Sequence, residues 1–245
     1  MDRVLRVEGL TKRFGGIVVA DALDFGVAPN TCLGVIGPNG AGKTSVFNLI
    51  DGSIRRDAGR IFLSERDISD FPKYQRARLG IARTYQIPQP FPDLTVFENV
   101  LAAATFSAGL SAADAGHATK EMIEKTGLSK RMTTMAGALT LLDRKRLELA
   151  RALAAAPKVL LLDEVAGGLT EQEVRVLVEL IRSLKKDVAM IWSEHVAHAL
   201  VAVADSIFLL NFGRKIAEGD PQALLDSREV REIYMGIVVD AALGS

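Results

Sequence analysis

Apolar residues in the first third of the chain occur in short runs that Gly, Pro and Asn residues separate. The runs cover residues 4–7, 17–19, 23–27, 31–36 and 60–63. Short runs of this kind, bounded by turn residues, are typical of β-strands joined by tight turns. We therefore expect the N-terminal part of the chain to be mostly sheet.

Between about residues 91 and 139 the pattern becomes helical. Apolar positions recur at helical spacing in stretches that are rich in Ala and contain Met, and the segment from Gly109 to Gly116 interrupts them. Ala and Met both favour the helix. This segment is predicted to be a small helical subdomain.

From Leu139 onward two patterns alternate. Helical periods at 144–156, 171–185 and 196–204 alternate with continuous apolar runs at 159–162, 188–192 and 206–210. Strands buried on both faces, as in a parallel sheet with crossover helices, have such continuous runs. The C-terminal part is therefore predicted to be α/β.

Charge and composition exclude some classes of protein. Lys and Arg together number 30, as do Asp and Glu, so the formal net charge is zero. This balance excludes the broad basic surface that holds nucleic acid phosphates, and we expect no nucleic acid partner. The single cysteine, Cys32, lies in an apolar run and is expected to be a structural thiol in a reducing compartment.

The sequence also predicts where the protein resides. Its N-terminus carries Asp2 and Glu8 and has no long apolar segment before a small-residue cleavage site, which argues against a secretory signal. The most apolar stretches are short or broken by Asp205, so they fall well under the length of a membrane span. We expect a cytoplasmic protein that serves a membrane only by docking to it.

The strongest local motif is the glycine-rich octapeptide at residues 37–44, which fits GxxxxGK(S/T). It follows the apolar run 31–36 and precedes a helical run that begins at Ser45, which is the context that a P-loop requires. Glycines let backbone N–H groups surround a phosphate, Lys43 reaches the β- and γ-phosphates, and Thr44 can hold Mg²⁺. We expect ATP to be bound by Gly37, Pro38, Asn39, Gly40, Ala41, Gly42, Lys43, Thr44 and Ser45.

A second motif is the apolar run 159–162, which ends in Asp163 and Glu164. A core strand followed by an acidic turn is ordinary when it stands alone. Downstream of a P-loop it predicts a Walker B segment, in which Asp163 binds Mg²⁺ through water and Glu164 polarises the attacking water.

The order and spacing of these motifs resemble the nucleotide-binding domain of an ABC transporter over essentially the whole chain. Phe14 is placed like the family's adenine-stacking aromatic, Gln86 like the Q-loop glutamine, and His195 like the switch histidine that contacts the γ-phosphate. The resemblance implies ATP and Mg²⁺ as cofactors. It also implies catalytic roles for Lys43, Gln86, Glu164 and His195, and metal binding by Thr44, Gln86 and Asp163.

The resemblance implies an α/β P-loop NTPase fold with a mixed core sheet. A single ABC ATPase domain is expected over residues 1–245. It would consist of a RecA-like core with an N-terminal antiparallel β subdomain, at about residues 1–90 and 140–245, and a helical subdomain at about 91–139.

One segment departs from the family pattern. Residues 139–143 stand where the family has the signature LSGGQ, whose Ser and Gly groups contact the γ-phosphate held by the opposing subunit. Thr140 retains a hydroxyl and is expected to contact ATP, whereas Leu141 and Leu142 replace the glycines. Thr170 likewise stands where the D-loop usually ends in Asp. Either a partner with an intact signature completes this chain's site while the reciprocal site is weak, or the subfamily tolerates the change.

The C-terminal segments at residues 213–221 and 228–236 resemble those of ATPases from branched-chain amino acid type importers. The ATPase of lipopolysaccharide export shares much of these two segments. The resemblance implies a second ATPase subunit, identical or related, and transmembrane permease subunits that contact the region from Gln86 to Phe97. A periplasmic or extracellular binding protein would act in the same system. The chain would then be peripheral on the inner face of the cell membrane.

Three other functions stay open from the sequence. An exporter ATPase would share these motifs. A weakly hydrolysing regulatory subunit would explain Leu141 and Leu142, although the retained Lys43, Asp163 and Glu164 argue for a working site. A soluble ABC-type ATPase acting on DNA or ribosomes usually carries long inserts or tandem cassettes, which 245 residues do not accommodate. The sequence alone names neither the cargo nor the direction of transport.

Overall fold

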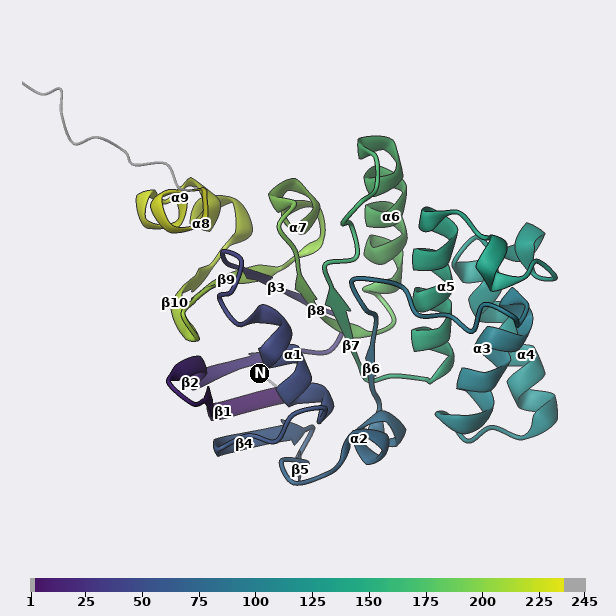
Figure 1. Cartoon of the computed structure of the whole chain (residues 1–245), viewed down its shortest axis with the longest axis horizontal. Helices are drawn as coiled ribbons and strands as arrows, with labels where there is room; N and C mark the ends of the chain where they lie inside the picture. Colours follow the sequence, from purple (N-terminus) through teal and green to yellow (C-terminus); the bar gives the residue numbers. More distant parts are fainter. Residues whose placement is uncertain (1–2, 236–245) are drawn as a thin grey trace, which may run out of the picture.

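A computed structural model describes residues 3–235 of the chain. Its N-terminal part is an antiparallel sheet in the strand order β2-β1-β4-β5 (Figure 1). Leu5 and Val7 of the first strand are buried, because one face of this sheet packs against the core. The strands are β1 (Leu5–Phe14), β2 (Ile17–Val27), β4 (Ala58–Leu63) and β5 (Arg66–Asp67).

A six-stranded sheet forms the centre of the molecule, in the order β10-β9-β3-β8-β7-β6. Neighbours from β9 to β6 are parallel, and β10 is antiparallel to β9. The strands are β3 (Cys32–Ile36), β6 (Ile81–Arg83), β7 (Val159–Asp163), β8 (Ala189–Ser193), β9 (Ser206–Asn211) and β10 (Arg214–Gly219).

The two faces of the central sheet belong to two separate cores. Leu161 and Ile191 pack with the N-terminal sheet and with α1 (Lys43–Asp51), which lies between the two sheets (Figure 1). Leu160 and Leu162 face the opposite side, where the C-terminal helices cover the sheet. These helices are α6 (Glu171–Leu184), α7 (Ala197–Val203), α8 (Pro221–Asp226) and α9 (Arg228–Met235). The alternation along β7 is why its sequence is continuously apolar.

A third core lies at one edge of the molecule, on the right in Figure 1. It is built by α3 (Val96–Phe106), α4 (Ala112–Lys125) and one face of α5 (Leu141–Ala154). Thr95 begins α3 with a capping box, because it exchanges hydrogen bonds with Glu98. The short helix α2 (Lys73–Leu79) precedes β6 and lies beside the lower end of this edge strand.

The structure differs from the sequence-based expectations in detail. The runs 17–19 and 23–27 form one strand, β2, which passes through an irregularity in its pairing with β1 at Ala22, where φ is +50°. Gly116 lies inside α4, so the helical break ends at Ser111, which caps α4. Gly236 and the predicted domain end at residue 245 lie outside the described residues. Within residues 3–235, each helix is too short or too polar to cross a membrane.

Candidate nucleotide-binding and hydrolysis site

The P-loop connects the end of β3 to the start of α1. Gly42 caps α1 with a φ of 108°, and a Cβ at this position would lie 2.5 Å from the carbonyl oxygen of Val19. Only glycine fits this turn. Since no side chain caps the helix, the first N–H groups of α1 are open to an anion.

Lys43 is buried and points back along the loop. Its ammonium donates hydrogen bonds to the carbonyl oxygens of Gly37 at 2.8 Å and Pro38 at 3.2 Å. These bonds hold the cation over a cavity of about 190 Å³ lined by Val19, Asn39, Gly40, Ala41, Gly42, Lys43, Thr44, Ser45 and Glu164. The cavity combines a lysine, a helix N-terminus and backbone donors, which is the chemistry that binds phosphate groups.

Three predicted site residues from distant segments meet at Glu164, which follows β7. Gln86 Nε2 donates a 2.8 Å hydrogen bond to Glu164 Oε2. Lys43 Nζ lies 3.8 Å from Oε1, and His195 Nδ1 lies 3.8 Å from Oε2. Glu164 takes a positive φ of 47°, and its N–H donates to the carbonyl of Ser193. The turn therefore aims the carboxylate into the P-loop cavity.

Asp163 ends β7, directly before Glu164, and is buried. The Ser193 hydroxyl donates to Oδ1 at 2.9 Å, and the Arg83 guanidinium donates to Oδ2 at 2.7 Å. Sequence reasoning did not select Arg83 or Ser193 as site residues. Their positions at the ends of β6 and β8, beside β7, were the available signal, because parallel strands end at one edge of the sheet.

The donor set is compatible with Mg²⁺ bound together with a nucleotide. Within residues 3–235, no three His, Cys, Asp or Glu side chains gather into a metal cluster. Mg²⁺ usually takes one or two carboxylates and completes its shell with phosphates and water. Asp163, the Thr44 hydroxyl and the Gln86 amide provide suitable oxygen ligands at this edge of the sheet.

Glu194 and Tyr234 fix the loop that carries His195. Glu194 is fully buried and accepts hydrogen bonds from the N–H groups of Ala166 at 2.6 Å and His195 at 3.3 Å. Burial raises the pKa of Glu194, and these hydrogen bonds oppose the rise. The Tyr234 hydroxyl donates to the His195 carbonyl at 2.7 Å, and burial raises the pKa of Tyr234 to about 12. The sequence analysis missed both residues, because each makes its contact through the tertiary fold.

Two predicted ATP contacts lie apart from the P-loop cavity. Phe14 ends β1 with 48% of its surface exposed, and the Lys12 ammonium lies 5.1 Å from its ring. Thr140 caps α5, where its hydroxyl accepts a hydrogen bond from the N–H of Asp143. Neither residue lines the P-loop cavity.

The two leucines in the signature position begin α5. Leu141 is 41% exposed, whereas Leu142 packs against the core under α6. A Cβ built on Gly168, which has a φ of 77°, would lie 3.2 Å from Leu141 Cδ2. The segment at Gly168 therefore lies directly against the modified signature.

Comparison with known proteins agrees with this architecture. The model of the ABC transporter family matches residues 20–167. The branched-chain amino acid transport ATP-binding protein LivG of Escherichia coli (strain K12) is 33% identical, with 95% of this chain and 98% of LivG covered. The lipopolysaccharide export ATP-binding protein LptB of Haemophilus influenzae is 32% identical, with 95% and 97% covered. A solved nucleotide-free ATP-binding cassette has a TM-score of 0.85 at 28% identity, covering 95% of this chain and 98% of the other.

The chain therefore belongs to the ABC transporter family, and it has the P-loop NTPase fold of that family's ATPase subunits. The resemblance inferred from the motif series is confirmed.

Proposed function

We propose that this chain binds and hydrolyses ATP to power an importer of branched-chain amino acids or related small organic substrates. The observation that carries the proposal is Glu164, which Gln86 holds at 2.8 Å beside the P-loop lysine. The high coverage of LivG, and of BraF from Pseudomonas aeruginosa at 33% identity, supports the choice of cargo class.

The described residues account for the steps of hydrolysis. Lys43 and the N–H groups of α1 would bind the β- and γ-phosphates of ATP. Glu164 would orient the attacking water and accept its proton, while His195, whose Nδ1 lies 3.8 Å from Glu164 Oε2, would contact the γ-phosphate. Mg²⁺, held by Thr44, Asp163 and Gln86, would supply charge neutralisation on the phosphates.

Completion of the site requires a second ATPase subunit in this account. Thr140 does not line this chain's own P-loop cavity, and the opposing subunit's signature would cover the γ-phosphate held there. In this chain's own signature, which would face the nucleotide of the partner subunit, Leu141 and Leu142 are bulkier than the glycines that they replace. We therefore propose that this chain's own site is the active one when the partner has an intact signature.

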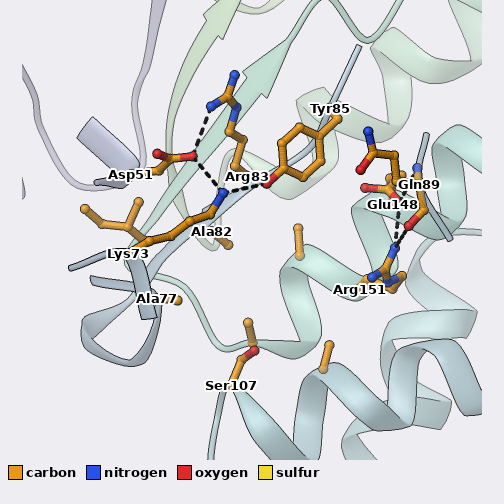
Figure 2. A pocket seen from close by; sticks show the side chains of 14 residues that line it. Asp51, Lys73, Ala77, Ala82, Arg83, Tyr85, Gln89, Ser107, Glu148 and Arg151 are labelled. Atoms are coloured by element: carbon orange, nitrogen blue, oxygen red, sulfur yellow. Dashed lines mark hydrogen bonds and ion pairs between the residues drawn. The ribbon is translucent and has the colours of Figure 1, made fainter. Parts of the chain in front are cut away.

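The permease is proposed to dock in a groove beside the Gln86 to Phe97 segment. A cavity of about 270 Å³ opens there, between β6 and α2 on one side and α3 and α5 on the other (Figure 2). Its lining includes the small apolar side chains of Ala82, Ala103 and Ala152, and charged residues stand at both ends (Figure 2). Ile87 and Phe91, both exposed, extend the apolar surface. We accordingly propose that the chain lies on the inner face of the cell membrane, and that a periplasmic or extracellular binding protein acts in the same system.

A lipopolysaccharide exporter is the second candidate, because LptB relatives match the chain almost as well as LivG. The test is transport by the complex that co-purifies with the tagged chain, reconstituted in proteoliposomes. ATP-dependent uptake of leucine, isoleucine or valine that Glu164→Gln abolishes would support the importer. Extraction of lipopolysaccharide without amino acid uptake would contradict it, and absence of nucleotide hydrolysis would indicate a regulatory subunit.

A further inference from the structure

Arg83 joins three segments that surround the nucleotide site. It ends β6, donates from Nη1 to Asn48 and Asp51 of α1, and donates from Nη2 to Asp163 at the end of β7. The three distances are 2.6, 3.0 and 2.7 Å. One side chain thus ties the P-loop helix to the Walker B strand.

The guanidinium also lies against two aromatic rings. Its central carbon lies 5.2 Å from the ring centre of Tyr85 and 5.7 Å from that of Phe47. The Arg83, Asp51 and Asp163 side chains are each about 95% buried, so water hardly competes for these bonds. With Nη2 bound to Oδ2 of Asp163 and the Ser193 hydroxyl bound to Oδ1, the orientation of this carboxylate depends on the guanidinium.

The same network reaches the wall of the proposed docking groove. Asp51 Oδ2, which accepts from Arg83, lies 3.5 Å from the ammonium of Lys73, and Lys73 donates to the Tyr85 hydroxyl at 2.9 Å. Figure 2 shows Asp51, Lys73, Arg83 and Tyr85 as one connected wall of this cavity. Lys73 is half exposed, so a ligand in the groove reaches it directly.

We propose that Arg83 is a positioning residue for Mg²⁺, because it orients the carboxylate of Asp163. The contacts of Arg83 with Asp51, and of Asp51 with Lys73, make this orientation respond to the permease segment that binds in the groove. The inference rests on the proposed function, because it assumes that Asp163 serves the metal. It adds a second connection, distinct from Gln86, between the groove and the hydrolysis site.

The test measures metal affinity separately from nucleotide affinity. Mn²⁺ binding to the nucleotide-loaded chain is followed by electron paramagnetic resonance, and ATP binding is measured in EDTA. Arg83→Lys keeps the positive charge but cannot make all three hydrogen bonds of the guanidinium. Asn48→Ala removes one hydrogen-bond acceptor of the guanidinium and leaves both carboxylates in place. Loss of a partner that orients a metal ligand typically weakens metal binding by about 10–100-fold, so Arg83→Lys should do so with ATP binding in EDTA unchanged. Asn48→Ala should have a smaller effect in the same direction.

Arg76 provides the matched control. It is also a buried arginine and also braces α1, but it donates to the backbone carbonyls of Leu49 and Ile50. Arg76→Lys should lower thermal stability and leave Mn²⁺ affinity unchanged. If Arg83→Lys weakens Mn²⁺ binding no more than Arg76→Lys does, Arg83 is only a structural residue and the proposal is overturned.

The connection to the groove has its own test. Lys73→Met should weaken Mn²⁺ binding several-fold, whereas Lys120→Met in α4, away from the groove lining, should not. Equal affinities in these two variants would overturn the connection. Failure of the wild-type chain to bind ATP at all would instead contradict the proposed function.

Discussion

Gln86 donates a 2.8 Å hydrogen bond to the carboxylate of Glu164, although 78 positions separate the two residues in the chain. Gln86 follows the edge strand β6, and Glu164 follows β7, which pairs with β6. The same glutamine begins the segment that forms the proposed docking surface. Movement of this segment would therefore change how Glu164 faces the P-loop cavity.

Gln86→Ala tests this relationship. We expect kcat for ATP hydrolysis to fall by about 10–100-fold with little change in KM, because Glu164 loses the group that orients it while the phosphate-binding loop stays intact. Gln89→Ala is the control, since Gln89 makes its hydrogen bonds through the backbone. Equal kcat values for the two variants would show that the Gln86 hydrogen bond has no part in hydrolysis.

Tyr234→Phe tests whether the C-terminal helix positions His195. The variant loses one hydrogen bond to the His195 carbonyl, which should cost about 1 kcal/mol and loosen the loop. We expect a lower kcat with an unchanged KM for ATP. Tyr74→Phe, on the exposed side of α2, should leave both constants unchanged. A fall in KM alone, or no kinetic change, would contradict the positioning role.

A third prediction concerns the bulk of the two leucines in the signature position. Replacing Leu141 and Leu142 together by Gly should raise ATP turnover of a dimer of this chain, if their bulk keeps the loop from the opposing γ-phosphate. The same change should lower stability, because Gly costs up to about 1 kcal/mol per helical position relative to Ala. Replacing both leucines by Ala removes their bulk without adding the backbone flexibility of Gly, so this variant shows which of the two changes alters turnover. Unchanged turnover in the Gly variant would show that this subfamily tolerates leucine here.

The pKa of Glu148 leads to a predicted pH dependence of stability. It is buried in the groove wall, where Arg151 donates to its Oε1 at 2.7 Å, and burial raises its pKa above the ordinary value despite Arg151. A carboxyl whose pKa is higher in the folded than in the unfolded state binds more protons when folded, so its contribution to stability is lost as pH rises.

The free energy of unfolding of Glu148→Gln should therefore increase relative to wild type between about pH 4 and pH 8, as measured by urea denaturation. Glu121→Gln, on the exposed surface of α4, is the control and should show no such trend. A difference between Glu148→Gln and wild type that stays constant or shrinks with pH would contradict a raised pKa at Glu148.

Local sequence patterns were sufficient to predict that the P-loop segment joins a strand to a helix and that the Walker B segment ends a buried strand. Each lies in one short stretch whose glycines, lysine or carboxylates follow a strand directly, so the fold places them together without further information. The continuous apolar runs predicted β7, β8 and β9 to within a residue or two. Gln86 and His195 were predicted only from the family resemblance, because no local pattern would have selected them.

Residues that act through tertiary contacts were not predictable in this way. Arg83 is one charged residue after a short strand, and only the packing of β6 against β7 and α1 brings it to Asp163 and Asp51. Tyr234 reaches His195 from a helix 39 positions later. The prediction divided strand β2 in two at Asp21, because pattern alone cannot distinguish an irregularity from a turn.

Steady-state ATP hydrolysis with Mg²⁺ by the complex that co-purifies with the tagged chain, beside the same complex carrying Glu164→Gln, tests the central claim most directly. We expect wild-type turnover that falls by at least about 100-fold in the variant, since a positioned general base contributes this much, while ATP still binds and traps a dimer. Equal turnover in the two proteins would show that Glu164 does not act on the attacking water and would contradict the account.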